Sequence, residues 1–198
     1  MRALIIVDIQ NDFLPGGALA VAQGDEVIPV INRIAPSYDL VVCTQDWHPA
    51  DHWSFASQHD GFTVGDVIRL NDLDQVLWPD HCVQDSYGAQ FADALDSRWT
   101  QHVFRKGTYV DVDSYSGFFD NGRRSATGMG DFLKSRGVTE ISVAGLATDY
   151  CVLFTALDGR SLGFDVSLIQ EACRGVELVP GDIADAVQKM QCAGVEIV

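Results

Sequence analysis

The sequence predicts an α/β fold with three layers, in which helices cover both faces of an open, mainly parallel six-stranded sheet. Two observations predict it. Short, continuous apolar runs recur along the chain, and such runs are typical of strands buried on both faces. Amphipathic segments separate most of these runs, as in repeated strand–helix units. The expected strands are Ala3–Val7, Leu40–Cys43, His102–Gly107, Ile141–Ala144, Phe164–Ile169 and Val195–Val198.

The expected helices lie between these strands and end at recognisable signals. From Gly24 to Ala35 the apolar residues fall on one face, and Pro36 ends the helix. A second helix from Asp131 ends at Arg136, where Gly137 is expected to cap it. The remaining helices are expected at Phe91–Trp99, from Thr148 or Asp149 onward, and at Pro180–Cys192.

Length and composition limit the classes of function. A chain of 198 residues predicts one domain spanning 1–198, with a loop-rich region at about 47–101 that could form a lid or metal site. The net charge of −15 argues against binding to nucleic acid or to an anionic membrane surface. The five cysteines include no CxxC pair, and the N-terminal apolar run is too short for an export signal, so we expect reduced thiols in the cytoplasm. Assembly into a homo-oligomer is left open.

Polar side chains follow four of the predicted strands at the point where each strand ends. In open α/β sheets, ligands bind beyond the carboxyl ends of the strands. We therefore expect the following side chains to meet at one edge of the sheet: Asp8, Asp46, His48, Lys106 and Cys151.

Cys151 is a candidate nucleophile at a strand-to-helix turn. With Thr148 as N-cap, it would lie in the first helical turn, where free backbone N–H groups favour a thiolate and lower the cysteine pKa. Asp8 could accept the thiol proton and Lys106 could stabilise the charges. The alternatives are a cysteine that merely packs the start of a helix and a buried Asp–Lys ion pair that serves structure.

Asp46 and His48 are two residues apart, which places both side chains on one face of an extended segment. With His52 and His81 they form a nitrogen and oxygen set suited to zinc, iron or manganese. The alternative is a group of unrelated, solvated loop histidines. Four loop aromatics are candidate walls for a flat ring, unless they serve ordinary packing: Phe13, Trp78, Tyr109 and Tyr115.

Six motifs, in order and over nearly the whole chain, resemble the nicotinamidase/pyrazinamidase family of isochorismatase-like cysteine hydrolases. These motifs are Val7–Phe13, Thr44–Pro49, Trp78–Val83, Phe104–Gly107, Tyr115–Phe118 and Gly145–Val152. The resemblance implies the isochorismatase-like fold. It also implies the hydrolysis of nicotinamide to nicotinate and ammonia through a cysteine thioester, a step of NAD salvage, and activity on pyrazinamide.

The resemblance further implies roles for the candidate residues. The catalytic triad would be Asp8, Lys106 and Cys151. One divalent metal ion, zinc first and iron or manganese as alternatives, would be held by Asp46, His48 and His81. His52 would be either a further ligand or a neighbour of the ligands. An oxyanion hole would use the amides of Ala147 and Cys151, beside a cis peptide between Leu146 and Ala147. The substrate ring would contact Phe13, Trp78 and Tyr115.

Other readings remain within and beyond this fold. Isochorismatases do not need the cysteine, so Cys151 argues against that activity. Hydrolases of N-carbamoylsarcosine and ureidoacrylate keep the triad but lack the metal ligands, so Asp46, His48 and His81 argue against them. A metal- or ligand-binding module without catalysis is the alternative from a different class, and an ammonia-release assay separates it from the enzyme.

Overall fold

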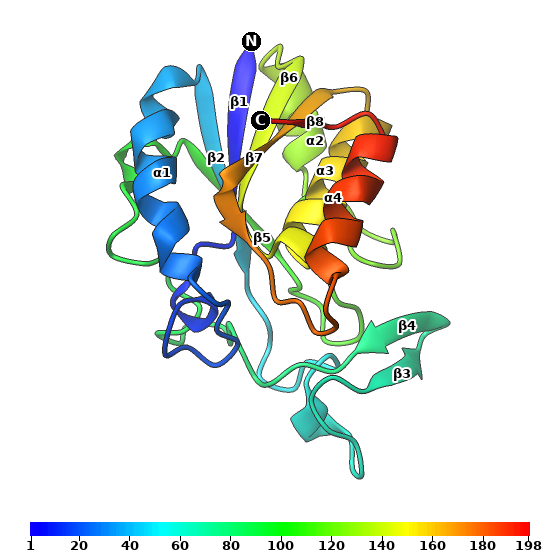
Figure 1. Cartoon of the computed structure of the whole chain (residues 1–198). Coiled ribbons are helices and arrows are strands. Elements are labelled where there is room, and N and C mark those ends of the chain that lie inside the picture. The colour runs from blue at the N-terminus through cyan, green and yellow to red at the C-terminus, as the bar shows by residue number, and fades with distance from the viewer.

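The computed structural model describes residues 1–198 and contains a six-stranded sheet whose neighbouring strands are all parallel. The strand order is β5-β2-β1-β6-β7-β8, so the chain starts at the centre of the sheet and builds outward (Figure 1). The strands are β1 (Arg2–Val7), β2 (Leu40–Asp46), β5 (His102–Lys106), β6 (Glu140–Leu146), β7 (Asp165–Arg174) and β8 (Glu196–Ile197).

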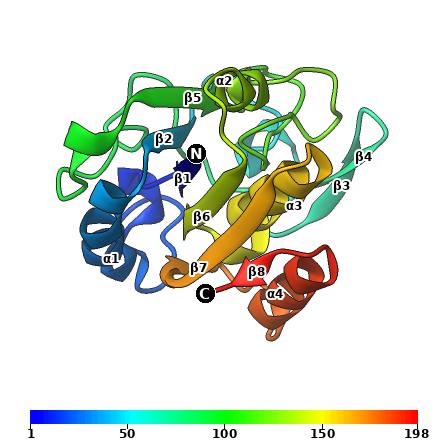
Figure 2. The ribbon, with the colours of Figure 1, turned by 90° about the horizontal axis from the view of Figure 1, so that it is seen from above.

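Helices cover both faces of this sheet, which confirms the predicted three-layer α/β fold (Figure 2). Successive residues of β1 point to opposite faces. Ala3 and Ile5 enter the core with three helices, whereas Leu4 and Ile6 enter the core with one. The single helix is α1 (Val27–Ile34), and the three helices are α2 (Met129–Ser135), α3 (Leu153–Ser161) and α4 (Asp182–Cys192). No helix is both long and apolar enough to cross a bilayer.

The predicted helix at Phe91–Trp99 is wrong. Only a short 3-10 turn, Ser97–Trp99, is present there. The backbone is engaged elsewhere, because the Asn32 side chain donates to the Ala94 carbonyl and accepts from the Asp96 amide, each at 2.8 Å. Pairing with another segment thus replaces the hydrogen bonds that a helix would make within itself.

The loop-rich region contains an antiparallel hairpin that the sequence interpretation did not include. Its strands are β3 (Val67–Leu70) and β4 (Leu73–Val76), at the lower right of Figure 1. The two turn residues, Asn71 and Asp72, have φ of 48° and 64°. Positive φ at both positions is typical of a two-residue hairpin turn, for which asparagine and aspartate are suited. The hairpin lies beyond the carboxyl ends of β1 and β2 (Figure 1).

Candidate active site

The register of the sheet brings the predicted polar residues together. Asp46 and Lys106 are direct partners at the ends of β2 and β5. Val7, which precedes Asp8, pairs with Gly145, which leads into the turn before Cys151. Gly145 has φ of 129°, and a Cβ there would lie 2.1 Å from the Val7 carbonyl oxygen. Only glycine therefore lets these two strand ends approach so closely.

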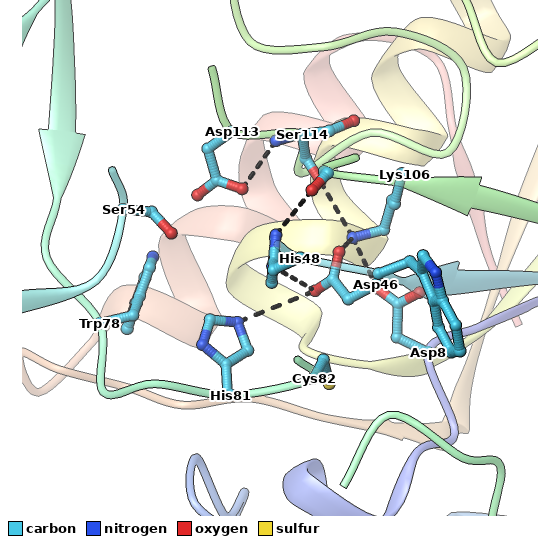
Figure 3. Close-up of polar contacts among 12 residues, drawn as sticks. Asp8, Asp46, His48, Ser54, Trp78, His81, Cys82, Lys106, Asp113 and Ser114 are labelled. Carbon is cyan, nitrogen blue, oxygen red and sulfur yellow. Dashed lines mark hydrogen bonds and ion pairs between the residues drawn. The ribbon is translucent and has the colours of Figure 1, made fainter. Parts of the chain in front are cut away.

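Lys106 is the central group of the site and has its side chain fully buried. Its Nζ lies 2.9 Å from Asp8 Oδ2 and 2.5 Å from Asp46 Oδ1 (Figure 3). It also donates to Cys151 Sγ at 3.4 Å. The fourth contact is to the Ser114 carbonyl, at 3.0 Å. Burial lowers the pKa of Lys106, but its two carboxylates outweigh burial and raise it well above the ordinary value. Lys106 is therefore a permanent cation between two carboxylates and a thiol.

Asp8 is placed to act as a base. It is wholly buried, and its backbone lies in the left-handed region with φ of 50°. The Thr44 hydroxyl donates to its Oδ1 at 2.6 Å, which fixes the orientation of the carboxylate. Burial raises the pKa of Asp8 to about 6, although the Lys106 charge opposes this shift. A carboxylate with this pKa is ionised at neutral pH and can still take up a proton.

Cys151 lies in a π-helical turn, Thr148–Val152, which continues into α3. Thr148 is not the N-cap as predicted; Ala147 holds that position, and its carbonyl accepts from the Tyr150 and Val152 amides. The predicted cis peptide between Leu146 and Ala147 is present. The expectation of a lowered cysteine pKa is wrong: burial, only partly opposed by Lys106, raises the pKa of Cys151 well above its ordinary value. The thiol is thus protonated at rest, and a nucleophilic role for it would require a base.

Two imidazoles converge on the other oxygen of Asp46. His48 Nδ1 lies 2.9 Å from the Gly107 carbonyl and His81 Nδ1 lies 2.8 Å from the Pro79 carbonyl, so both Nδ1 atoms donate. The Nε2 atoms are left 3.7 Å and 4.0 Å from Asp46 Oδ2 (Figure 3). Carbonyl acceptors of this kind commonly fix metal-binding histidines.

The polar atoms between these groups fit a divalent cation. His48 Nε2 is buried and has no hydrogen-bond partner. Two Nε2 lone pairs and a carboxylate oxygen face one another, and a cation would bind all three. Ligand atoms of Asp46, His48 and His81 all lie within 4.8 Å of one another. One carboxylate therefore links this set to Lys106.

His52 lies beside this set, with its ring centroid 4.3 Å from that of His48. Both of its nitrogens have protein partners. The Ser54 amide donates to Nδ1 at 3.2 Å, so Nε2 carries the proton and donates to the Val112 carbonyl at 3.3 Å. Both nitrogens are thus hydrogen-bonded in this arrangement, although ligand atoms of His48, His52 and Asp113 also lie within 4.8 Å of one another.

A small cavity of about 30 Å³ lies between the thiol of Cys151 and the imidazole of His81. Its lining includes Phe13, Trp78, Tyr115, Ala147, Cys151, Asp46 and His81. Trp78 Nε1 donates to the Tyr115 hydroxyl at 3.2 Å, which joins two of the aromatic walls. Tyr109, the fourth candidate aromatic, is 58% exposed and lies outside this lining.

Sequence reasoning missed several residues that complete the site. Thr44 directly follows the predicted strand Leu40–Cys43, but nothing in the sequence indicates that its hydroxyl would bind Asp8. Asp113 lies in a loop rich in glycine, serine and aspartate, where nothing in the sequence distinguishes it. It lines the cavity and accepts from the Ser114 amide and the Gln75 side chain. Tyr150 and Val176 also line the cavity, and their apolar character alone gave no signal.

Comparison with known proteins identifies the family of the chain. The isochorismatase domain model matches residues 2–196. The chain belongs to the isochorismatase family. Within it, the chain is 50% identical to a nicotinamidase of Escherichia coli, over 98% of this chain and 92% of that protein.

Solved structures give the same placement. A nicotinamidase/pyrazinamidase of Acinetobacter baumanii is 44% identical, with a TM-score of 0.97 over 100% of this chain and 95% of that one. A pyrazinamidase of Pyrococcus horikoshii in complex with zinc is 36% identical, with a TM-score of 0.81 over 100% and 98% of the two chains.

Proposed function

We propose that the chain is a metal-containing amidohydrolase that converts nicotinamide to nicotinate and ammonia through a cysteine thioester, and that it also hydrolyses pyrazinamide. The observation that carries this proposal is the contact of one buried lysine with Asp8, Asp46 and Cys151, beside two converging imidazoles. A protonated thiol, a base and a fixed cation are what nucleophilic attack on an unreactive amide requires. The similarity to nicotinamidases supports this substrate.

In the proposed mechanism, Asp8 accepts the Cys151 proton and the thiolate attacks the carboxamide carbon. Lys106 balances the negative charge that passes between them. Backbone amides of Ala147 and Cys151 stabilise the oxyanion, and removing one such donor typically costs about 10²–10³-fold in kcat. Asp8 then gives its proton to the departing ammonia. Water hydrolyses the thioester, with Asp8 again as the base, and releases nicotinate.

We assign Asp46, His48 and His81 as the ligands of one divalent ion, with zinc as the first candidate. The ion would supply positive charge that orients the substrate and polarises water. We assign His52 as a neighbour that packs against His48, because both of its nitrogens already have partners. The zinc complex of the Pyrococcus pyrazinamidase supports this choice of metal.

Phe13, Trp78 and Tyr115 are the proposed contacts of the substrate ring. All three line the cavity that contains Cys151, and Phe13 and Trp78 are buried at 6% and 3% exposure. Buried aromatic walls exclude water and favour a flat ring.

The test is ammonia release from nicotinamide by the purified chain, before and after removal of metal by a chelator. We expect turnover, its loss on chelation and its recovery with zinc. Nicotinamide binding without ammonia release would contradict the proposal and support a binding module. Turnover that survives complete removal of metal would contradict the metal assignment alone.

A further inference from the structure

We infer that Gln10 is a positioning residue that fixes Asp46 between the triad and the metal site; this inference rests on the metal site proposed above. Gln10 is completely buried. Its Nε2 donates to the Asp46 carbonyl at 2.8 Å, and its Oε1 accepts from the Asp46 amide at 2.8 Å. One side-chain amide thus binds both backbone groups of a single residue, as a neighbouring strand would.

Gln10 replaces a strand neighbour that β2 lacks at this point. The pairing of β1 with β2 ends at Ile6 and Cys43, three residues before Asp46. On its other side, β2 stays paired with β5 up to Asp46 and Lys106. Without Gln10, the polar backbone groups of Asp46 that face away from β5 would be buried without a partner, which would destabilise this end of β2.

The orientation of Asp46 matters because its two carboxylate oxygens serve different partners. Oδ1 lies 2.5 Å from Lys106 Nζ, and Oδ2 faces the Nε2 atoms of His48 and His81. A rotation of the Asp46 backbone would disturb the contact with Lys106 and the contacts with the two imidazoles at once. Gln10 also contacts Asp8, the proposed base, because the backbone N–H of Gln10 donates to the backbone carbonyl of Asp8 at 2.9 Å. One residue therefore sets the spacing of Asp8 and Asp46.

The contacts of Gln10 require an amide and exclude a carboxylate. Its Nε2 donates to two carbonyls, those of Asp46 and Ala89, while its Oε1 accepts from an N–H. In Gln10→Glu, a carboxylate oxygen would face both carbonyls and no donor would remain. Gln10→Met keeps the length of the side chain and removes all three hydrogen bonds without adding charge.

Gln45 provides a matched control. It is also buried, at 7% exposure, and its Nε2 donates to the same Ala89 carbonyl at 2.9 Å. Its Oε1 accepts from Arg105 Nε, and it makes no side-chain contact with Asp46. Gln45→Glu thus also removes a hydrogen bond to the Ala89 carbonyl, but it leaves the hydrogen bonds between Gln10 and Asp46 intact.

The experiment measures the zinc affinity of metal-stripped wild type, Gln10→Glu, Gln10→Met and Gln45→Glu by competition with a chromophoric chelator. Circular dichroism at the same temperature establishes that each variant is folded. Loss of a residue that orients a metal ligand typically weakens affinity about 10- to 100-fold, and we expect this for both Gln10 variants. We expect Gln45→Glu to stay within about threefold of wild type, and kcat at saturating zinc to fall only in the Gln10 variants.

Each other outcome has a defined meaning. A folded Gln10 variant with wild-type zinc affinity and kcat would overturn the inference, as would equal losses in Gln10→Glu and Gln45→Glu. Equal zinc affinity of wild type and Asp46→Ala would instead overturn the proposed metal site. The two failures are therefore distinguishable, because the second is read from a variant that leaves Gln10 unchanged.

Discussion

The site has a strand half and a loop half, and the two are held in place differently. Asp8, Lys106 and Cys151 lie at or just beyond the ends of three strands, so sheet register and the buried core fix them. His48 and His81 lie in the loop region, where hydrogen bonds to the Gly107 and Pro79 carbonyls hold their rings. The proposed bond-breaking groups thus lie at the edge of the sheet and its buried core, and the proposed ligand-binding imidazoles lie in its loops.

In the loop half, the carboxylate of Asp12 holds the segment that follows His81. Asp12 Oδ2 accepts from the Cys82 amide at 2.7 Å, directly after His81. Gly88 packs so closely on this carboxylate that a Cβ there would lie 1.9 Å from Asp12 Oδ2. One aspartate near the end of β1 therefore ties the histidine loop to the sheet. We expect changes in the strand half to abolish chemistry and changes in the loop half to alter binding.

Cys151→Ala should have the largest effect on turnover. It removes the proposed nucleophile from the strand half and leaves every imidazole contact intact. We expect ammonia release to fall by at least about 10⁴-fold, in line with the loss of other catalytic nucleophiles. Zinc affinity, measured by chelator competition, should stay within about threefold of wild type. Substantial residual turnover would remove Cys151 as the nucleophile.

His81→Ala should lower zinc affinity, the property that Cys151→Ala is expected to leave unchanged. It removes one proposed ligand from the loop half and leaves the contacts of Lys106 in place. We expect zinc affinity to fall by more than the roughly 100-fold upper range seen for residues that merely orient ligands. His59→Ala is the control, because His59 is bonded to the Trp53 carbonyl and lies outside the site. Unchanged zinc affinity in His81→Ala would break the division between the two halves.

The same division explains what sequence could predict. Strand-end residues such as Asp8 and Lys106 were found from apolar runs and the alternation of strands and helices, because parallel strands end at one edge of the sheet. For His81 and Trp78 the residues alone give only candidate sets, and the proposed roles as metal ligand and ring contact come from resemblance to a family, since loop spacing does not fix position in space. The pKa of Cys151 was predicted in the wrong direction, because burial depends on packing that the sequence does not show.

The pH dependence of turnover tests the strand half, with a smaller expected effect than the two substitutions above. Asp8 acts as a base only when ionised, and burial raises its pKa to about 6. Its ionised fraction, and with it kcat/KM, should fall about tenfold for each pH unit below that value. Steady-state ammonia release between pH 5 and 8 measures this, and zinc retention at pH 5 is the control for ligand protonation. A flat profile with zinc retained would exclude Asp8 as the base.

Tyr115→Phe should have the smallest effect, and it sharpens the comparison because it changes one wall of the loop half. The variant removes the hydroxyl that accepts from Trp78 Nε1 at 3.2 Å, so a buried indole N–H loses its partner. A lost hydrogen bond of about 0.5–1.5 kcal/mol corresponds to a roughly two- to tenfold rise in KM, because the wall positions the ring in substrate and transition state alike. We expect kcat and zinc affinity to stay close to wild type. Tyr109→Phe, at an exposed tyrosine outside the cavity, should change neither kcat nor KM. A fall in kcat at constant KM would mean that Tyr115 acts on the chemical step, and the two halves would then not divide chemistry from binding.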